Sequence, residues 1–231
     1  MEQFFSVLLQ CPLFVSIEEA DYAGLLSCIN AYTKTFHNEE YILFSGDEVS
    51  HVGIVLSGSL EILKENPAGA KHILAFLSPA NIFGEGIVCT HNRISPVTVK
   101  AKESTIILFI PYERIIKSCS SSCSFHNQLI KNMVMLLGEK NLILNQKIEL
   151  LTLKGMREKL ATYLLTESQR QAGLTFQIIP NRNELAEYLN VSRTSMCREL
   201  ARMKELQIID YYQNSFKILS VNLLKECLLN E

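Results

Sequence analysis

Residues 83–97, FGEGIVCTHNRISPV, combine small, acidic and basic residues at a spacing that could bind an anion. Gly84 and Glu85 begin this stretch like a loop whose backbone amides cradle a phosphate, because glycine lets the backbone approach an anion closely. A guanidinium could pair with that anion through two parallel hydrogen bonds, and Arg93 is the only arginine of the stretch. Since Ile-Ser-Pro follows Arg93, the residues leave open whether the stretch holds an anion or something more apolar.

A second stretch, residues 181–203, has the pattern of two short helices joined by a tight turn. Asn181 and Glu184 form a capping box at the start of the first helix. Ser192 is placed to cap the second helix, whose inner face is predicted at Met196, Leu200 and Met203.

The outward face of the second helix could read DNA bases. It is predicted to carry Arg193, Thr194, Cys197 and Arg198. Arginine can bond guanine through two donors, and small polar residues allow close approach to base edges. The alternative is a merely solvated face formed by Arg193, Arg198 and Arg202. It is disfavoured because capping, turn and periodicity all agree on one motif.

The seven cysteines are scattered, at positions 11, 28, 89, 119, 123, 197 and 227. None forms a C-x-x-C pair, and Cys119-x3-Cys123 alone is a poor zinc or cluster signature. We therefore expect reduced thiols and no metal site.

The stretch 83–97 lies in a region of strand periodicity. Residues 38–111 alternate apolar and polar positions, with turns such as Ser45-Gly46-Asp47, Ser57-Gly58 and Asn66-Pro67-Ala68-Gly69. This pattern predicts an all-β barrel or roll. The expected strands are 41–44, 52–56, 60–64, 73–77, 97–101 and 105–110, and a helical segment is expected before them over 17–31.

A long helix is predicted over residues 125–151, where the period changes. Six residues form an a/d seam of about three heptads: Val134, Leu137, Asn141, Leu144, Ile148 and Leu151. Such a seam predicts a two-stranded coiled coil, and an Asn at an a position suits a parallel pair because each amide can bond its mate. The alternative is an amphipathic helix that packs only on its own β-domain.

Gly155 ends the long helix, and the elements after it have the order of a winged helix-turn-helix. We expect a helix over 156–168, a strand-like piece over 174–180, the two helices of 181–203, and a hairpin over 208–219.

Charge and composition exclude several classes. The net charge is −2: residues 1–150 carry 11 Lys and Arg against 15 Asp and Glu, and residues 151–231 carry 11 against 9. An acidic front and a mildly basic back suit a sensor joined to a polyanion-binding module. No apolar run can span a bilayer, and the N-terminus lacks the basic region of a secretory signal, so we expect a cytoplasmic protein without a membrane partner. An enzyme is disfavoured because no Ser/His/Asp order, P-loop or H-E-x-x-H motif occurs.

The whole chain resembles the Crp/Fnr family of bacterial transcription regulators, named for the cyclic AMP receptor protein and the fumarate-nitrate reduction regulator. The resemblance is carried by Gly46-Asp47, Ser57-Gly58, Phe83-Gly84-Glu85, the long helix and the segment ELAEYLNVSRTSMCREL. It implies an α+β fold in three parts. These are a cyclic-nucleotide-binding-like β-roll (a double-stranded jelly roll) over 1–124, a dimerisation helix over 125–152, and a winged helix-turn-helix DNA-binding domain over 153–231.

The same resemblance implies the partners and the DNA-binding residues. A homodimer would read a palindrome in double-stranded DNA, respond to a small-molecule effector, and contact RNA polymerase if it is an activator. In the family, the positions of Arg182 and Ser192 commonly contact phosphate, and those of Arg193, Thr194 and Arg198 read bases. The cyclic AMP receptor branch has glutamate where Thr194 stands, so an acceptor suited to cytosine is missing here. The predicted set is Arg182, Ser192, Arg193, Thr194, Ser195, Cys197, Arg198 and Arg202.

The predicted effector pocket comprises Gly84, Glu85, Arg93, Ser95, Pro96, Val97, Asn141 and Asn145. In nucleotide-binding members, Gly-Glu is followed about ten residues later by Arg-Ser or Arg-Thr, where glutamate takes the ribose hydroxyl and arginine the cyclic phosphate. Here Ser95 and Pro96 stand at that distance, and Arg93 lies two residues early, about 7 Å away along a strand. We expect an effector that is smaller or more apolar than cyclic AMP. There are two alternatives. In the first, a two-residue loop deletion brings Arg93 into register as a phosphate clamp, and the protein is a cyclic-nucleotide receptor. In the second, the protein binds DNA without any effector.

Two cofactor-binding branches of the family can be compared with this chain. The oxygen-sensing branch has an N-terminal cysteine cluster, whereas only Cys11 and Cys28 occur in that region here, so no iron–sulfur cluster is expected. Cys89 and His91 form a C-x-H pair that is a weak haem motif. A surface histidine and a half-buried thiol are the preferred interpretation of that pair.

Overall fold

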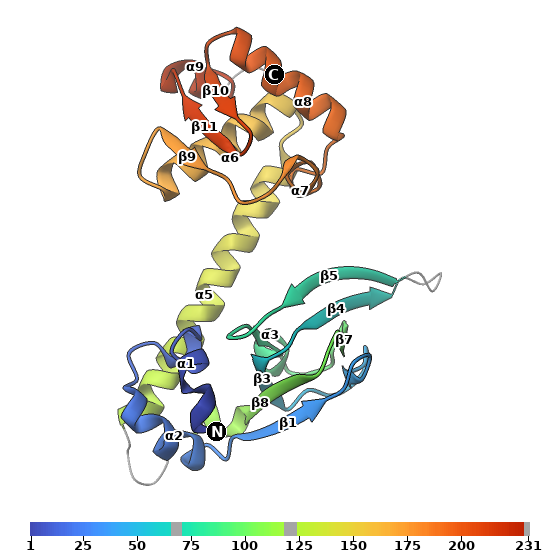
Figure 1. The fold of residues 1–231 in the computed structure, drawn as a ribbon, viewed down its shortest axis with the longest axis vertical. Helices are drawn as coiled ribbons and strands as arrows, with labels where there is room; N and C mark the ends of the chain where they lie inside the picture. The colour runs from blue at the N-terminus through green and yellow to red at the C-terminus, as the bar shows by residue number, and fades with distance from the viewer. Residues whose placement is uncertain (66–70, 118–123, 229–231) are drawn as a thin grey trace. The chain divides into compact units, whose positions relative to one another are not determined.

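The computed structural model of the protein describes residues 1–65, 71–117 and 124–228. The predicted turn at 66–69 and the cysteines at positions 119 and 123 lie outside the described residues. The chain divides into two compact units, Met1–Lys140 and Asn141–Glu231, which are described separately (Figure 1).

The first unit is built on two antiparallel four-stranded sheets, with strand orders β1-β8-β3-β6 and β2-β7-β4-β5. The strands are β1 Tyr32–Phe36, β2 Tyr41–Leu43, β3 His51–Ser57, β4 Leu60–Glu65, β5 Lys71–Leu77, β6 Ile82–Phe83, β7 Thr98–Ala101 and β8 Thr105–Pro111. The predicted roll is confirmed, while β1 and β6 were not predicted.

Two apolar clusters meet at β3, whose residues 52–56 are all buried. Val52, Ile54 and Leu56 face the cluster that the helices cover, and Val55 faces the cluster inside the roll. A strand that is covered on both faces has a nearly continuous apolar sequence, as residues 52–56 do.

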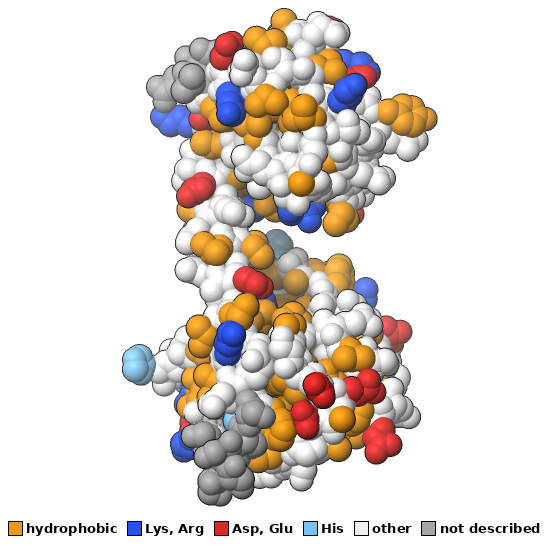
Figure 2. All heavy atoms as spheres, turned by 90° about the vertical axis from the view of Figure 1, so that its left-hand side faces the viewer, with side chains coloured by type: hydrophobic (Ala, Val, Ile, Leu, Met, Phe, Trp, Pro, Cys, Tyr) orange, Lys and Arg blue, Asp and Glu red, His pale blue; other side chains and the backbone are white. Residues whose placement is uncertain are grey.

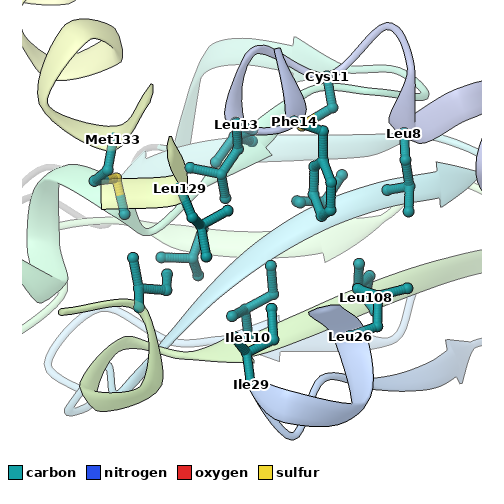
Figure 3. Packing of buried hydrophobic residues seen from close by; sticks show 14 of the residues in the cluster. Leu8, Cys11, Leu13, Phe14, Leu26, Ile29, Leu108, Ile110, Leu129 and Met133 are labelled. Carbon is teal, nitrogen blue, oxygen red and sulfur yellow. The ribbon is translucent and has the colours of Figure 1, made fainter. Parts of the chain in front are cut away.

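Helices cover one face of the first sheet. They are η1 Glu2–Phe4, α1 Phe5–Leu8, η2 Pro12–Phe14, η3 Glu19–Asp21, α2 Tyr22–Cys28 and α5 Ser124–Thr152, with the short α3 Glu85–Val88 and α4 Tyr112–Ile116 elsewhere in the unit. The helical segment predicted over 17–31 is therefore shorter. Figure 3 shows side chains of α2, β8 and the first turns of α5 gathered in one cluster, in which Ile29, Ile110, Leu129 and Met133 are at most 3% exposed.

The second unit contains the C-terminal part of α5 and the elements of a winged helix-turn-helix, as predicted. These are α6 Met156–Arg170, β9 Thr175–Gln177, α7 Arg182–Tyr188, α8 Arg193–Glu205, β10 Ile209–Tyr212, β11 Ser215–Ile218 and α9 Val221–Glu226, with the sheet order β10-β11-β9. Helix α9 was not predicted.

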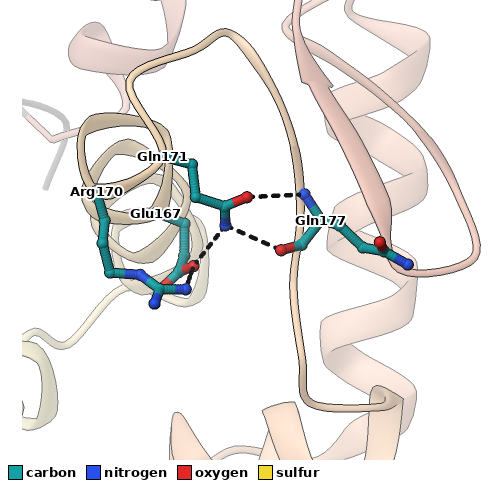
Figure 4. A network of polar contacts seen from close by, with 4 residues as sticks. All are labelled: Glu167, Arg170, Gln171 and Gln177. Carbon is teal, nitrogen blue, oxygen red and sulfur yellow. Dashed lines mark hydrogen bonds and ion pairs between the residues drawn. The ribbon is translucent and has the colours of Figure 1, made fainter.

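A polar network joins the end of α6 to β9 (Figure 4). The Gln171 side chain donates to the Gln177 carbonyl at 2.9 Å and to Glu167 Oε2 at 3.1 Å, and its Oε1 accepts from the Gln177 amide at 3.3 Å. Because these bonds satisfy both backbone groups of Gln177, they fix where β9 leads into α7.

Candidate functional site

The start of α7 and the turn into α8 are held by local hydrogen bonds. Asn181 Oδ1 accepts from the amides of Asn183 and Glu184 at 2.9 and 3.1 Å, and Glu184 accepts from the Asn181 amide at 2.8 Å. Asn190 adopts a left-handed φ of 51°, which asparagine tolerates and which turns the chain toward α8. Ser192 Oγ accepts from the Ser195 amide at 3.4 Å and caps α8.

Two lysines bind the carbonyls at the end of α7. Lys159 Nζ, from α6, donates to the Leu189 carbonyl at 3.2 Å, and Lys147 Nζ, from α5, donates to the Tyr188 carbonyl. Burial, and secondarily the charge of Lys159, lowers the pKa of Lys147. Positive charge at a helix C-terminus is stabilising, so these lysines tie α7 to both preceding helices.

The inner face of α8 lies as predicted. Met196, Leu200 and Met203 are at most 1% exposed and pack in the core of the second unit. Periodicity then leaves the opposite face to solvent, where Arg193, Thr194, Ser195 and Arg198 are exposed. Arg193 and Arg198 have no hydrogen-bond or ion-pair partner within the described part of the chain.

Arg202 differs from these two arginines because a carboxylate lies beside it. Glu199 pairs with Arg202 at 3.7 Å and with Arg157 of α6 at 2.5 Å. Part of the positive charge of α8 is therefore neutralised within the protein.

Cys197, predicted on the outward face of α8, is only partly exposed. Its side chain is half-buried against the core of the second unit. The helical spacing placed it at the edge of the apolar face, and the thiol is small and apolar enough to pack there.

Arg182 holds the wing, the hairpin formed by β10 and β11. Its guanidinium lies over the rings of Tyr211 and Phe216 at 5.1 and 4.8 Å and donates to the Gln213 carbonyl at 2.9 Å. Burial lowers the pKa of this arginine. Arg182, predicted to contact phosphate, is thus half-buried and engaged by the wing turn, where Gln213 has a φ of 50°.

The first unit contains a cavity of about 340 Å³, lined by Gly84 and its neighbours at the start of the stretch 83–97. Gly84 has a φ of 81°, a left-handed conformation that glycine adopts freely, and it begins α3. Apolar side chains line most of the cavity: Leu43, Ile62, Ala75, Leu77, Ile82, Phe83, Ile87, Val97 and Val99.

One ion pair supplies the charge in this cavity. Glu85 is 8% exposed, and its Oε1 lies 2.5 Å from Lys140 Nζ on α5. Lys140 was not predicted as a site residue. Helix α5 packs on the roll through Leu129, Met133 and Leu136, and Lys140 is the next residue on the same face, since these four positions are four, three and four residues apart. This helical spacing could have identified Lys140 from the sequence.

The structure brings only some of the predicted pocket residues together. Gly84, Glu85 and Val97 line the cavity, whereas Arg93, Ser95 and Pro96 do not. Ser95 is buried and its hydroxyl bonds the backbone of Val97, while Pro96 is exposed.

Arg93 is directed to other partners. Its Nη2 lies 3.0 Å from Glu113 Oε1, and its guanidinium lies 5.0 Å from the ring centre of Tyr112. With a φ of 51°, its backbone forms part of a turn instead of an extended strand. No arginine lines the cavity among the described residues.

Asn141 and Asn145 were also predicted in the pocket. Both belong to the second unit and are exposed. Cys89 and His91 are exposed as well, and the described residues contain no group of three or more His, Cys, Asp or Glu side chains that could hold a metal ion.

The predicted seam of α5 carries solvent-exposed apolar side chains, and hydrophobic atoms lie on the surface of this helix in Figure 2. Val134, Leu144 and Ile148 are 65, 60 and 57% exposed, Leu151 and Asn141 are exposed, and Leu137 packs partly against the core of the first unit. A helix that crossed a membrane would need a long, uncharged apolar run, which none of the helices in the described ranges has.

Two family models match the chain. One, described as a cyclic nucleotide-binding domain, matches residues 33–122, and the other, a Crp-like helix-turn-helix domain, matches residues 158–227. The chain is 26% identical to the transcriptional activator protein Anr of Pseudomonas protegens over 203 residues, which cover 86% of this chain and 80% of the relative. It is 22% identical to the cyclic AMP receptor protein of Thermus thermophilus over 185 residues, which cover 80% and 82%.

Solved structures share this fold. The catabolite activator protein of Thermus thermophilus aligns with a TM-score of 0.54 and 23% identity, over 94% of this chain and 98% of that one. A CooA variant from Carboxydothermus hydrogenoformans aligns with a TM-score of 0.57 and 23% identity, over 94% of each chain.

Proposed function

Because this chain belongs to the Crp/Fnr family of transcription regulators, we propose that it acts as a homodimer on palindromic DNA and responds to an effector other than cyclic AMP. The observation that carries the effector assignment is the cavity beside Gly84, which is apolar apart from the pair between Glu85 and Lys140. A bound cyclic phosphate there would meet no guanidinium among the described residues.

The exposed face of α8 supports the DNA-binding role. Arg193 and Arg198 are free to donate to guanine edges, and Thr194 and Ser195 are small enough for close approach. In this proposal Ser192 contacts phosphate, and Arg182 acts on DNA through the wing that it holds.

The apolar seam of α5 supports the homodimer. A monomer would leave Val134, Leu144 and Ile148 in water, whereas a second copy of the helix would cover all three. Two recognition helices would then read half-sites about one helical turn, roughly 34 Å, apart.

The remaining roles follow from the family alone. The relative from Pseudomonas protegens is named as a transcriptional activator. We propose by analogy a cytoplasmic protein that contacts RNA polymerase on some of its operators.

Isothermal titration with cyclic AMP, combined with DNA selection, tests this function. We expect selection from random DNA to recover a palindrome and titration to show no micromolar binding of cyclic AMP. Micromolar binding that disappears in Arg93→Ala would restore the nucleotide-receptor function. Recovery of no preferred sequence would remove the regulatory role.

A further inference from the structure

The roll contains a second cavity, of about 220 Å³, between β1, β3 and β8. Phe83 and Leu43 line this cavity as well as the one beside Glu85, so the two cavities have these side chains in common. Neither Glu85 nor Lys140 lines the second cavity, which is therefore not the site assigned to the effector above.

One wall of this second cavity is made of aromatic rings arranged around Phe109. Tyr32 stacks on Phe109, with ring centres 5.5 Å apart and planes at 26°. Phe36 and Phe83 meet it edge to face, with ring centres 6.2 and 6.3 Å away. The aliphatic side chains Ile42, Leu43 and Val49 also line the cavity, together with the charged residues Lys34 and Glu48.

Gly53 lets the Phe83 ring take its place in that wall. A Cβ on Gly53 would lie 2.2 Å from Phe83 Cζ, so the ring lies directly against the backbone of β3. A glycine inside a central strand costs stability, and here it makes room for a ring that borders both cavities.

The rim of the cavity offers polar groups. His51 contacts the rings of Tyr32 and Phe109, and its Nδ1 lies 2.8 Å from Ser50 Oγ. Its Nε2 has no partner in the described part of the chain, and burial lowers the pKa of the ring, which favours the neutral form. A neutral imidazole can donate to or accept from a ligand, depending on its tautomer.

We propose that this cavity is a second binding site, which takes a small planar heteroaromatic molecule of one or two fused rings. The ring plane of the ligand would lie against the aromatic rings around Phe109, and its polar atom would bond His51 Nε2. The volume of about 220 Å³ is sufficient, because a cavity of about 150 Å³ in another protein accommodates benzene and the difference leaves room for a second fused ring.

A ligand in this cavity would act on the effector site through Phe83, one of the two side chains that line both cavities. Phe83 directly precedes Gly84, which begins α3 and carries Glu85 into the other cavity. Filling the second cavity restricts the Phe83 ring and, with it, the loop that opens the effector site.

Indole is a suitable probe because the chain contains no tryptophan. Indole fluorescence, excited where tyrosine does not absorb, therefore reports the probe alone. We expect a saturable change in indole emission with the full-length protein. Tyr32→Ala should weaken binding about tenfold, as removal of one stacked ring does, and His51→Ala should also weaken it.

Tyr41→Ala is the matched control. Tyr41 is 37% exposed, compared with 46% for Tyr32, and stacks on Phe44 outside the cavity, so this variant should bind indole like the unmodified protein. Cross-relaxation between indole and the Phe109 ring protons, measured by NMR, gives the location independently of any variant.

Two results would overturn the proposal. One is the absence of saturable binding up to the solubility limit of indole. The other is binding that Tyr32→Ala and His51→Ala leave unchanged but Lys140→Met abolishes, which would place indole in the effector cavity. Neither result bears on whether cyclic AMP binds there.

Discussion

Arg193 and Arg198 are the arginines of the second unit whose guanidinium groups no carboxylate or carbonyl among the described residues engages. Arg157 and Arg202 share Glu199, Arg170 pairs with Glu167, and Arg182 donates to the wing turn. Free guanidinium groups on an exposed helix face can reach base edges without first breaking an internal contact.

Arg193→Ala should weaken binding to the selected operator by about 1–3 kcal/mol and relax the preference at one base pair in each half-site. Gel-shift titration on operators substituted one pair at a time measures this. Lys225→Ala on α9, which removes the same charge from another exposed position, is the control and should leave the preference intact. An unchanged preference in Arg193→Ala would contradict the assigned recognition helix.

Arg182→Ala should behave differently, because its contacts hold the wing. We expect weaker binding to all DNA sequences alike, together with a lower thermal midpoint as the stacking on Phe216 and the bond to Gln213 are lost. Calorimetry and binding to random DNA measure the two effects. Loss of affinity without loss of stability would instead indicate a direct phosphate contact.

The pair formed by Glu85 and Lys140 should be visible in stability. Lys140→Met leaves the Glu85 carboxylate, 8% exposed, without its partner and should cost about 1–3 kcal/mol. Adding Glu85→Gln should recover most of that loss in denaturant unfolding. Lys117→Met is the control, since its pair with Glu113 is solvent-exposed and should contribute little. Equal losses of stability in Lys140→Met and Lys117→Met would show that the pair in the cavity contributes no more than an exposed ion pair.

Thiol reactivity should follow burial. Burial raises the pKa of Cys11 to about 12, whereas Cys89 is exposed. Because the thiolate is the reactive form, iodoacetamide should modify Cys89 first and Cys11 last among the described cysteines of the native protein. Mass spectrometry over time gives the order, and early labelling of Cys11 would contradict the packing of the N-terminal helices.

At the scale of elements, α5 changes character along its length. Its first turns bury Leu129, Met133 and Leu136 against the roll, and its C-terminal part exposes Leu144 and Ile148. Leu144→Asp with Ile148→Asp should therefore give folded monomers in sedimentation equilibrium. Ile143→Asp is the matched control, because Ile143 is 61% exposed but lies outside the seam. Dimers of unchanged affinity in the double variant would show that the seam does not form the dimer interface.

Periodic elements could be predicted from the sequence, and side-chain partners could not. The heptads of α5 and the capping box at Asn181 are local patterns, so they were identified. Strand β1 was missed because its residues 32–35 are exposed and its sequence is mostly polar, and β6 has only two residues. The partner of Arg93 is Glu113, 20 residues away, and no spacing rule links a loop arginine to a carboxylate in a later helix.

At the scale of the whole molecule, the internal engagement of Arg182 and Arg202 bears on counterion release. Each phosphate that a cation neutralises contributes about −0.9 to the slope of log affinity against log salt concentration, so six to ten contacts cost about 10³–10⁵ in affinity between 50 and 200 mM salt. Arg182 is held by the wing, and Arg202 shares its charge with Glu199. When a subunit binds DNA, fewer ions are therefore released than if both arginines contacted phosphates. Shifts in the ionic strength of the cell should then change operator occupancy less than they do for regulators whose arginines all face the phosphates.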